Sequence, residues 1–168
     1  EIMRRVVFMR SIEDKDLTVL EKLNHIRPFM ESHLSTLKNM SRFVDDWILD
    51  SIIQPFGDAK LFNMPTAVDV LKDQFDVYNT SPKFIVDWRW YKDIVGLDNG
   101  FNAACVEGYY TSNINLIDTR ISSVSHSTEI GRKIEDYCER VWELMQQYEK
   151  GSSEAYEDLR KILEEFSK

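Results

Sequence analysis

Cysteine and glycine are scarce in this chain, and their scarcity excludes several classes of protein. Only two of the 168 residues are Cys, which argues against a disulfide scaffold, and neither Cys105 nor Cys138 has a second thiol nearby for a zinc or dithiol redox motif. We predict two reduced, buried thiols in a cytoplasmic protein. The six Gly form neither a G-x-G-x-x-G nor a G-x-x-x-x-G-K-[ST] motif, so the sequence contains no recognisable Rossmann or P-loop nucleotide site.

Long apolar runs and an excess of positive charge are also missing. Apolar runs such as Val6–Met9 are four residues long, far below the ~18 that a membrane span requires. The 29 acidic residues outnumber the 21 basic ones and give a net charge of -8, whereas a reader of the phosphate backbone needs a basic surface. We therefore expect no membrane partner and no nucleic-acid partner.

What the chain does contain indicates one mainly α (α+β) domain over residues 1–168. Its composition is 43% hydrophobic and 30% charged, which is ordinary for a globular protein. We predict three parts, namely a helical N-terminal part at 11–76, a turn-rich aromatic middle at 77–127 and a C-terminal helix pair at 128–167. A few short strands are expected in the middle.

Apolar spacing and capping residues predict the elements of the N-terminal part. A strand at Arg4–Arg10 is followed by a helix that starts with a capping-box-like Ser11 and ends near Pro28. One apolar stripe then runs from about 29 to 54. A further helix is expected from Pro65 to about Phe75, with Asn63 as its cap and Val68 and Leu71 turned inward.

The middle and the end of the chain have different patterns. Strands are predicted at Lys83–Val86 and Ile114–Ile121, and the serines around His126 at 122–127 are interpreted as the entry to a helix. The C-terminal helices are the clearest prediction, because apolar residues step by four and three along an a/d-like seam. That seam consists of Ile130, Ile134, Tyr137, Val141, Leu144 and Tyr148. After a break at Gly151, a second helix carries Tyr156, Leu159, Leu163 and Phe166 on its apolar face. We expect the two helices to be antiparallel.

One run of acidic residues is a candidate metal-binding site. Asp45, Asp46 and Asp50 spell D-D-x-x-x-D, which resembles the first metal motif of class I terpene synthases over six residues, and that resemblance implies magnesium and a diphosphate. Those enzymes need a larger helical barrel and a second metal motif, which this chain lacks. Helix geometry turns Asp46 and Asp50 away from the apolar stripe, and Arg42 stands four residues before Asp46 for an ion pair. We therefore predict a solvated face and no metal, and we interpret the three histidines as structural or surface residues.

The densest candidate for function is an aromatic-basic segment at 87–92. Aromatic planes stack on ligands and cations clamp phosphates or carboxylates. The segment fits either a strand or, slightly better, a helix ended by Gly96, and polar side chains downstream could line a pocket. The structural alternative is that its tryptophans anchor a junction in the core. The predicted ligand-binding residues are Trp88, Arg89, Trp90, Tyr91, Lys92, Asn99, Asn102, Tyr109 and Tyr110.

Two functions remain open at this point. The first is a binding or accessory domain that contacts a small polar or anionic ligand, or a protein partner, through 87–92. The second is the C-terminal portion of a larger group-transfer enzyme, methyltransferase-like or glycosyltransferase-like, whose catalytic or cofactor motifs lie outside this chain. The sequence names no cofactor and no oligomeric state.

Overall fold

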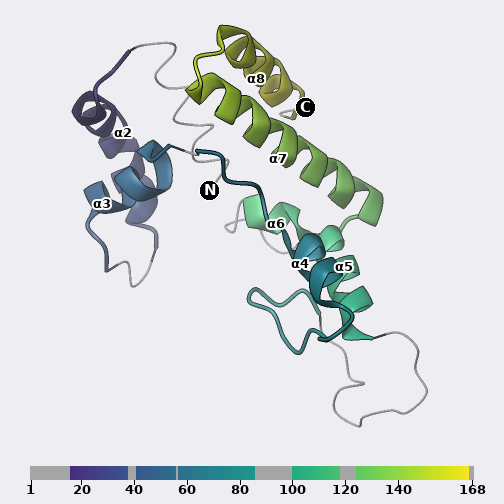
Figure 1. Cartoon of the computed structure of the whole chain (residues 1–168). Helices are drawn as coiled ribbons and strands as arrows, with labels where there is room; N and C mark the ends of the chain where they lie inside the picture. Colours follow the sequence, from purple (N-terminus) through teal and green to yellow (C-terminus); the bar gives the residue numbers. More distant parts are fainter. Residues whose placement is uncertain (1–15, 38–40, 56, 86–99, 118–123, 167–168) are drawn as a thin grey trace. The chain divides into compact units, whose positions relative to one another are not determined.

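The computed structural model describes residues 16–37, 41–55, 57–85, 100–117 and 124–166. The described chain is mainly helical (Figure 1) and contains no β-strand within those ranges. The elements are α2 (Val19–Leu34), α3 (Val44–Ile48), the π-helical segment η1 (Leu49–Ile53), α4 (Met64–Leu71), α5 (Phe101–Ser112), α6 (Ile114–Ile117), α7 (Thr128–Glu149) and α8 (Ser153–Phe166).

The strands predicted for the middle of the chain were wrong wherever they are described. Residues 83–85 have no regular structure, and 114–117 form the short helix α6. Asn113, which ends α5, keeps right-handed helical dihedrals, so the backbone is already set to form another helical turn. The strand predicted at Arg4–Arg10 and the rest of the 114–121 prediction lie outside the described residues.

Contacts divide the chain into two compact units. Unit 1 consists of Glu1–Asp58 with Val141–Lys161, and unit 2 consists of Ala59–Arg140 with Ile162–Lys168. Both α7 and α8 contribute residues to each unit. The single domain over 1–168 stays a prediction, and the units are described separately.

In unit 1, α2 starts with a true capping box and continues through its proline. The Thr18 hydroxyl accepts a hydrogen bond from the Glu21 backbone while the Glu21 carboxylate accepts one from the Thr18 backbone. The predicted break at Pro28 was wrong, since Pro28 lies inside the helix. An internal proline costs ~3 kcal/mol, but each buried large apolar side chain contributes ~1.5–3 kcal/mol. The burial of four such side chains on one face of α2 outweighs the cost of the proline. They are Leu23, Ile26, Met30 and Leu34.

The predicted stripe from 29 to 54 is not one helix. The helix α2 ends at Leu34, where the hydroxyls of Ser35 and Thr36 donate to the carbonyls of Ser32 and His33. Such local side-chain bonds compete with continuation of the helix. Among the described residues, the next helical elements are α3 and η1, whose buried residues are Trp47, Ile48 and Ile52.

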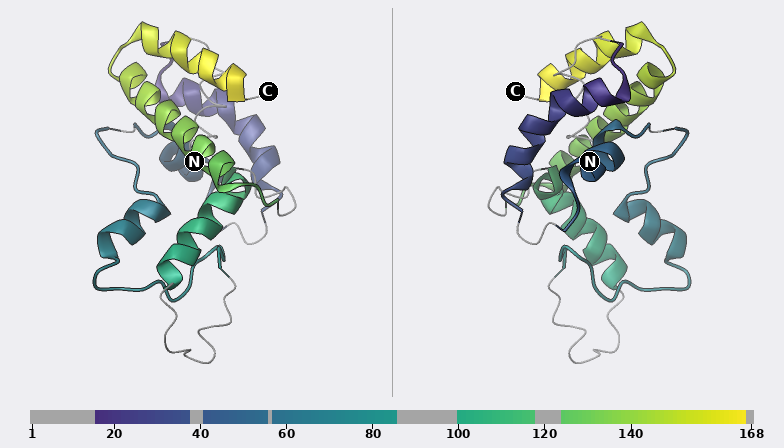
Figure 2. Two further views of the ribbon diagram at one scale, coloured as in Figure 1. Left: turned by 90° about the vertical axis from the view of Figure 1, so that its right-hand side faces the viewer. Right: turned by 90° about the vertical axis from the view of Figure 1, so that its left-hand side faces the viewer.

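The C-terminal helices form where the seam predicted them. In unit 1, Leu144 of α7 and Leu159 of α8 are almost completely buried. A turn at Gly151, which has a left-handed φ of 95°, reverses the chain. On the two sides of this turn the Tyr148 and Tyr156 rings lie 5.5 Å apart, and the two helices run side by side there in both views of Figure 2.

In unit 2, α4 follows the predicted cap and α5 crosses α7 at very short range. The Asn63 side chain accepts from the Thr66 backbone and Val68 is buried, as predicted. The inward orientation predicted for Leu71 was wrong, because this last residue of α4 is 50% exposed. A Cβ atom on Gly131 of α7 would lie 1.8 Å from the Tyr110 carbonyl oxygen of α5, so this crossing requires glycine.

Candidate functional site

The structure describes three of the nine predicted ligand-binding residues. Asn102, Tyr109 and Tyr110 lie on α5, whereas Trp88, Arg89, Trp90, Tyr91, Lys92 and Asn99 lie outside the described residues. The role predicted for that undescribed group stays a prediction. Each described residue can be judged by what its side chain contacts.

Tyr109 joins three elements of unit 2 through a shared carboxylate. Its side chain is buried, and its hydroxyl donates a 2.6 Å hydrogen bond to Oε2 of Glu135 on α7. The second oxygen, Oε1, accepts a 2.6 Å hydrogen bond from Nδ2 of Asn63, the N-cap of α4. Burial, together with the neighbouring Glu135 carboxylate, raises the pKa of Tyr109 well above its usual value. The phenol therefore stays protonated and acts as a permanent donor within the fold.

Tyr110 is likewise occupied within unit 2. It is 9% exposed, and the guanidinium of Arg132 on α7 lies 4.4 Å from the centre of its ring, a distance at which a cation is attracted to an aromatic face. Arg132 therefore contacts a ring of its own fold.

Asn102 and Asp76 form a reciprocal hydrogen-bonded clamp. The Asp76 carboxylate accepts from the Asn102 backbone at 2.9 Å and from the Phe101 backbone at 3.4 Å, so it caps α5, whose own N-cap, Gly100, has no side chain. In return, the Asn102 amide donates to the Phe75 carbonyl at 3.0 Å and accepts from the Val77 backbone at 2.8 Å. The clamp fixes the backbone of residues 75–77 against the first turn of α5.

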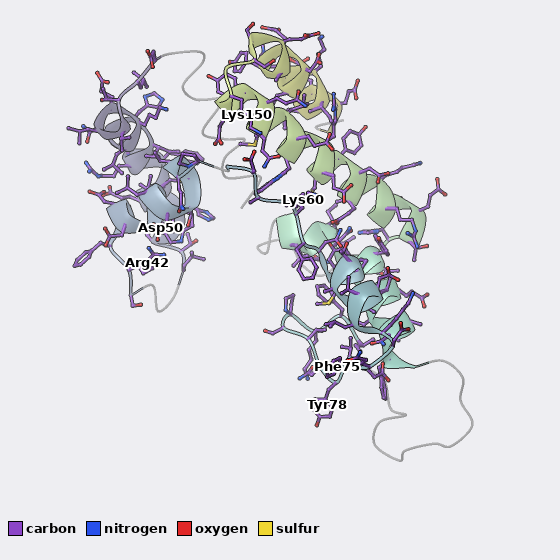
Figure 3. All side chains as sticks on the ribbon, viewed as in Figure 1. Arg42, Asp50, Lys60, Phe75, Tyr78 and Lys150 are labelled. Atoms are coloured by element: carbon purple, nitrogen blue, oxygen red, sulfur yellow. The ribbon has the colours of Figure 1, made fainter. Side chains whose placement is uncertain are left out.

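The segment held by this clamp carries two exposed aromatic side chains. Phe75 is 63% exposed and Tyr78 is 87% exposed, and Figure 3 shows both at the same end of unit 2. Further exposed apolar residues belong to α4 or stand just before it. We call these exposed side chains along residues 62–78 the α4 surface, a name for the set rather than for one face: Phe62, Val70, Leu71, Phe75 and Tyr78.

The sequence analysis did not identify the α4 surface, although a signal was available. Val70 lies two residues after the buried Val68 and therefore on nearly the opposite side of the helix, ~200° away. A helix that is apolar on opposite sides has to pack against other parts of a protein on both sides to remove its apolar surface from water. Within the described residues, α5 packs against α4, and α7 contacts its N-cap through Glu135.

The acidic string at 45–50 forms ion pairs. Both carboxylate oxygens of Asp45 accept from the Arg27 guanidinium, at 2.7 and 2.8 Å, and this pairing lowers the pKa of Asp45. Arg42 pairs with the Asp50 carboxylate (Figure 3), so the ion pair predicted between Arg42 and Asp46 was wrong. The partner differs from the predicted one because Arg42 precedes α3 and its guanidinium reaches the Asp50 carboxylate in η1. Of Asp46 it contacts the backbone carbonyl.

No cluster of three or more metal-ligating side chains occurs among the residues that the structure describes. His126 donates its backbone N–H to the Thr111 carbonyl, which ties the loop before α7 to α5. The Ser127 hydroxyl accepts from the Ile130 backbone, as expected for a helix entry.

Both cysteines are free thiols in unit 2. The prediction that both are buried is confirmed for Cys105 and wrong for Cys138, which is half-buried. Cys105 is completely buried, and its burial raises its pKa. Burial and the negative charge of Glu135 raise the pKa of Cys138 to about 11. Neither is an activated nucleophile, because the reactive form is the thiolate.

We expect slow thiol modification with a steep pH dependence. At pH 8 a pKa of about 11, compared with an ordinary 9.0, lowers the thiolate fraction of Cys138 about 100-fold. Its reaction with a disulfide reagent should accelerate about tenfold per pH unit from pH 8 towards 11. The denatured chain, whose thiols ionise near their ordinary pKa, is the control. Native thiols that react at the denatured rate would contradict this assignment.

The chain matches no family model, no curated protein and no solved structure. Among the described helices, none is both long enough and apolar enough to cross a bilayer.

Proposed function

We propose that this chain is an accessory domain that binds a protein partner through the α4 surface and through the aromatic-basic segment 87–92, which follows it in the sequence. The observation that carries the proposal is the exposure of Phe75 and Tyr78 on a segment that four hydrogen bonds hold to the start of α5. Two of these bonds are made by the backbone of Phe75 and Val77, and the other two by the Asp76 carboxylate. Exposed aromatic side chains are enriched where proteins contact each other. A backbone that is ordered in advance loses less conformational entropy on binding.

The contacts of α5 favour a protein over a small polar ligand. A pocket for an anion needs polar side chains with hydrogen-bonding capacity to spare. Asn102 and Tyr109 both donate to groups of their own fold, and Arg132 lies over Tyr110. The small-ligand interpretation now depends on 87–92 and Asn99 alone, while the α4 surface offers apolar contact area.

Position-specific photo-crosslinking tests the proposal. A photo-crosslinking amino acid at position 78 of the full chain, expressed in its own cells, should give a discrete crosslinked protein product. The same probe at Phe43 of unit 1, which is 81% exposed, is the matched control and should give none. Adding Asn102→Ala should weaken the product at 78 several-fold, because it releases the clamp. A product that is missing at 78, or equal at both positions, would overturn the proposal.

A further inference from the structure

We infer that one buried water molecule binds between the end of α5 and the loop that leads into α7, where it donates hydrogen bonds to Asn113 and His126. The inference is independent of the proposed partner. It rests on two side-chain atoms, Oδ1 of Asn113 and Nε2 of His126, which are closed off from bulk solvent and have no hydrogen-bond partner among the described residues. Buried polar atoms are almost always paired with the protein or with an ordered water, because an unpaired one costs free energy.

Both unpaired atoms are acceptors, and this decides what kind of group can satisfy them. Nδ2 of Asn113 donates to the Gly131 carbonyl at 2.8 Å, so the other atom of the amide is a carbonyl oxygen, which can only accept. Nδ1 of His126 lies 3.1 Å from the Ser127 carbonyl oxygen. Because a carbonyl cannot donate, Nδ1 carries the proton, and Nε2 of the neutral ring is an acceptor. Two acceptors cannot bond to each other, whereas a water can donate to both.

A closed circuit of hydrogen bonds brings the two side chains to one junction. The Asn113 amide is bonded to Gly131, whose backbone N–H donates to the Ser127 carbonyl at 3.1 Å. That same carbonyl contacts the His126 ring. The circuit closes where the His126 backbone N–H donates to the Thr111 carbonyl at 3.0 Å, two residues before Asn113. Both acceptors therefore belong to the same small group of residues in unit 2.

The surroundings of this junction favour water over other ligands. Asn113 is only 3% exposed. A Cβ atom on Gly131 would collide with the Tyr110 carbonyl, so α5 and α7 approach too closely there to admit a larger molecule. An amide and a neutral imidazole supply no charge to compensate a buried ion. Buried waters typically make about three hydrogen bonds to polar groups that the protein leaves unpaired. Bound here, the water joins the loop before α7 to the end of α5.

Nuclear Overhauser measurements between water and the full chain test this inference. The carbon-bound protons on either side of Nε2 of His126 do not exchange with solvent, so their cross-peaks to water report proximity alone. We expect these protons and the Cβ protons of Asn113 to show cross-peaks with the sign of a water that stays bound for longer than nanoseconds. The exposed ring of His25 in unit 1 is the matched control and should show no such signal.

A variant tests whether the two side chains share the water. Asn113→Leu keeps a similar volume but removes the acceptor, and it should weaken the His126 signal at least several-fold. The same substitution at the exposed Asn24 of unit 1 should leave the signal unchanged. Circular dichroism verifies that each variant keeps its helices.

Two results would overturn the inference. One is the absence of a long-lived water signal at His126 in the unchanged chain, and the other is a signal that persists undiminished in folded Asn113→Leu. If Asn113→Leu does not fold, the unchanged chain decides alone, since a bound water detected at His126 but not at Asn113 contradicts a shared site.

Discussion

Gly131→Ala is expected to destabilise the protein by about 2–4 kcal/mol, although alanine is the better helix former. In an exposed helix this change stabilises by ~1 kcal/mol. Here the added Cβ would lie 1.8 Å from the Tyr110 carbonyl oxygen, a backbone atom that cannot move unless α5 moves. Overpacking of this kind typically costs 1–3 kcal/mol, and more when the backbone must shift. Urea denaturation, followed by circular dichroism, measures the effect.

The control for this prediction is Gly100→Ala at the start of α5. A Cβ there would meet the Asp76 carboxylate at 3.4 Å, an ordinary contact with a side chain, so the change should cost no more than the ~1 kcal/mol typical of a lost cap preference. If Gly131→Ala proves neutral or stabilising, the close crossing of α5 and α7 is incorrect. The position of Tyr109 against Glu135 would then lose its basis.

Tyr109→Phe should lower the free energy of unfolding by about 1–2 kcal/mol. The variant keeps the ring and removes the hydroxyl that donates to Glu135 at 2.6 Å. Hydrogen bonds to charged groups contribute ~1.5–3 kcal/mol. Because Asn63 still satisfies the other carboxylate oxygen, we expect a loss around the lower end of that range. Chemical denaturation at pH 7 measures it.

The adjacent tyrosine is a matched control. Tyr110 is buried to a similar extent, and its hydroxyl makes no hydrogen bond to another described residue. Tyr110→Phe retains the ring beneath Arg132 and should change stability by less than about 0.5 kcal/mol. Equal losses for the two variants would show that the Tyr109 hydroxyl has no special role in joining α4, α5 and α7.

Apolar spacing and capping residues correctly predicted the helices that follow these local rules. The three-and-four spacing from Ile130 to Tyr148 gave α7, and Asn63 gave the start of α4. Two predictions failed where the structure departs from a local rule. Pro28 stays inside α2 because four buried apolar residues outweigh the lost hydrogen bond. The residues 114–117 form a helix although their β-branched side chains favour a strand.

The candidate site was harder to predict, because its contacts join residues that are distant in sequence. Asn63 meets Glu135 across 72 residues, and Asp76 meets Asn102 across 26. The spacing of residue types along the sequence does not indicate which distant side chains form such pairs. Asn102, Tyr109 and Tyr110 look like pocket residues in the sequence, since amides and phenols bind ligands, but their partners lie within the fold.

Radical footprinting of the unmodified chain tests most directly the central claim that the α4 surface is covered by a protein partner. Tyr78 and Phe43, which are 87% and 81% exposed, should be labelled to a similar extent in dilute purified protein. In cells that contain the protein, labelling of Tyr78 relative to Phe43 should fall several-fold, as determined by mass spectrometry. An unchanged ratio in cells would contradict the account.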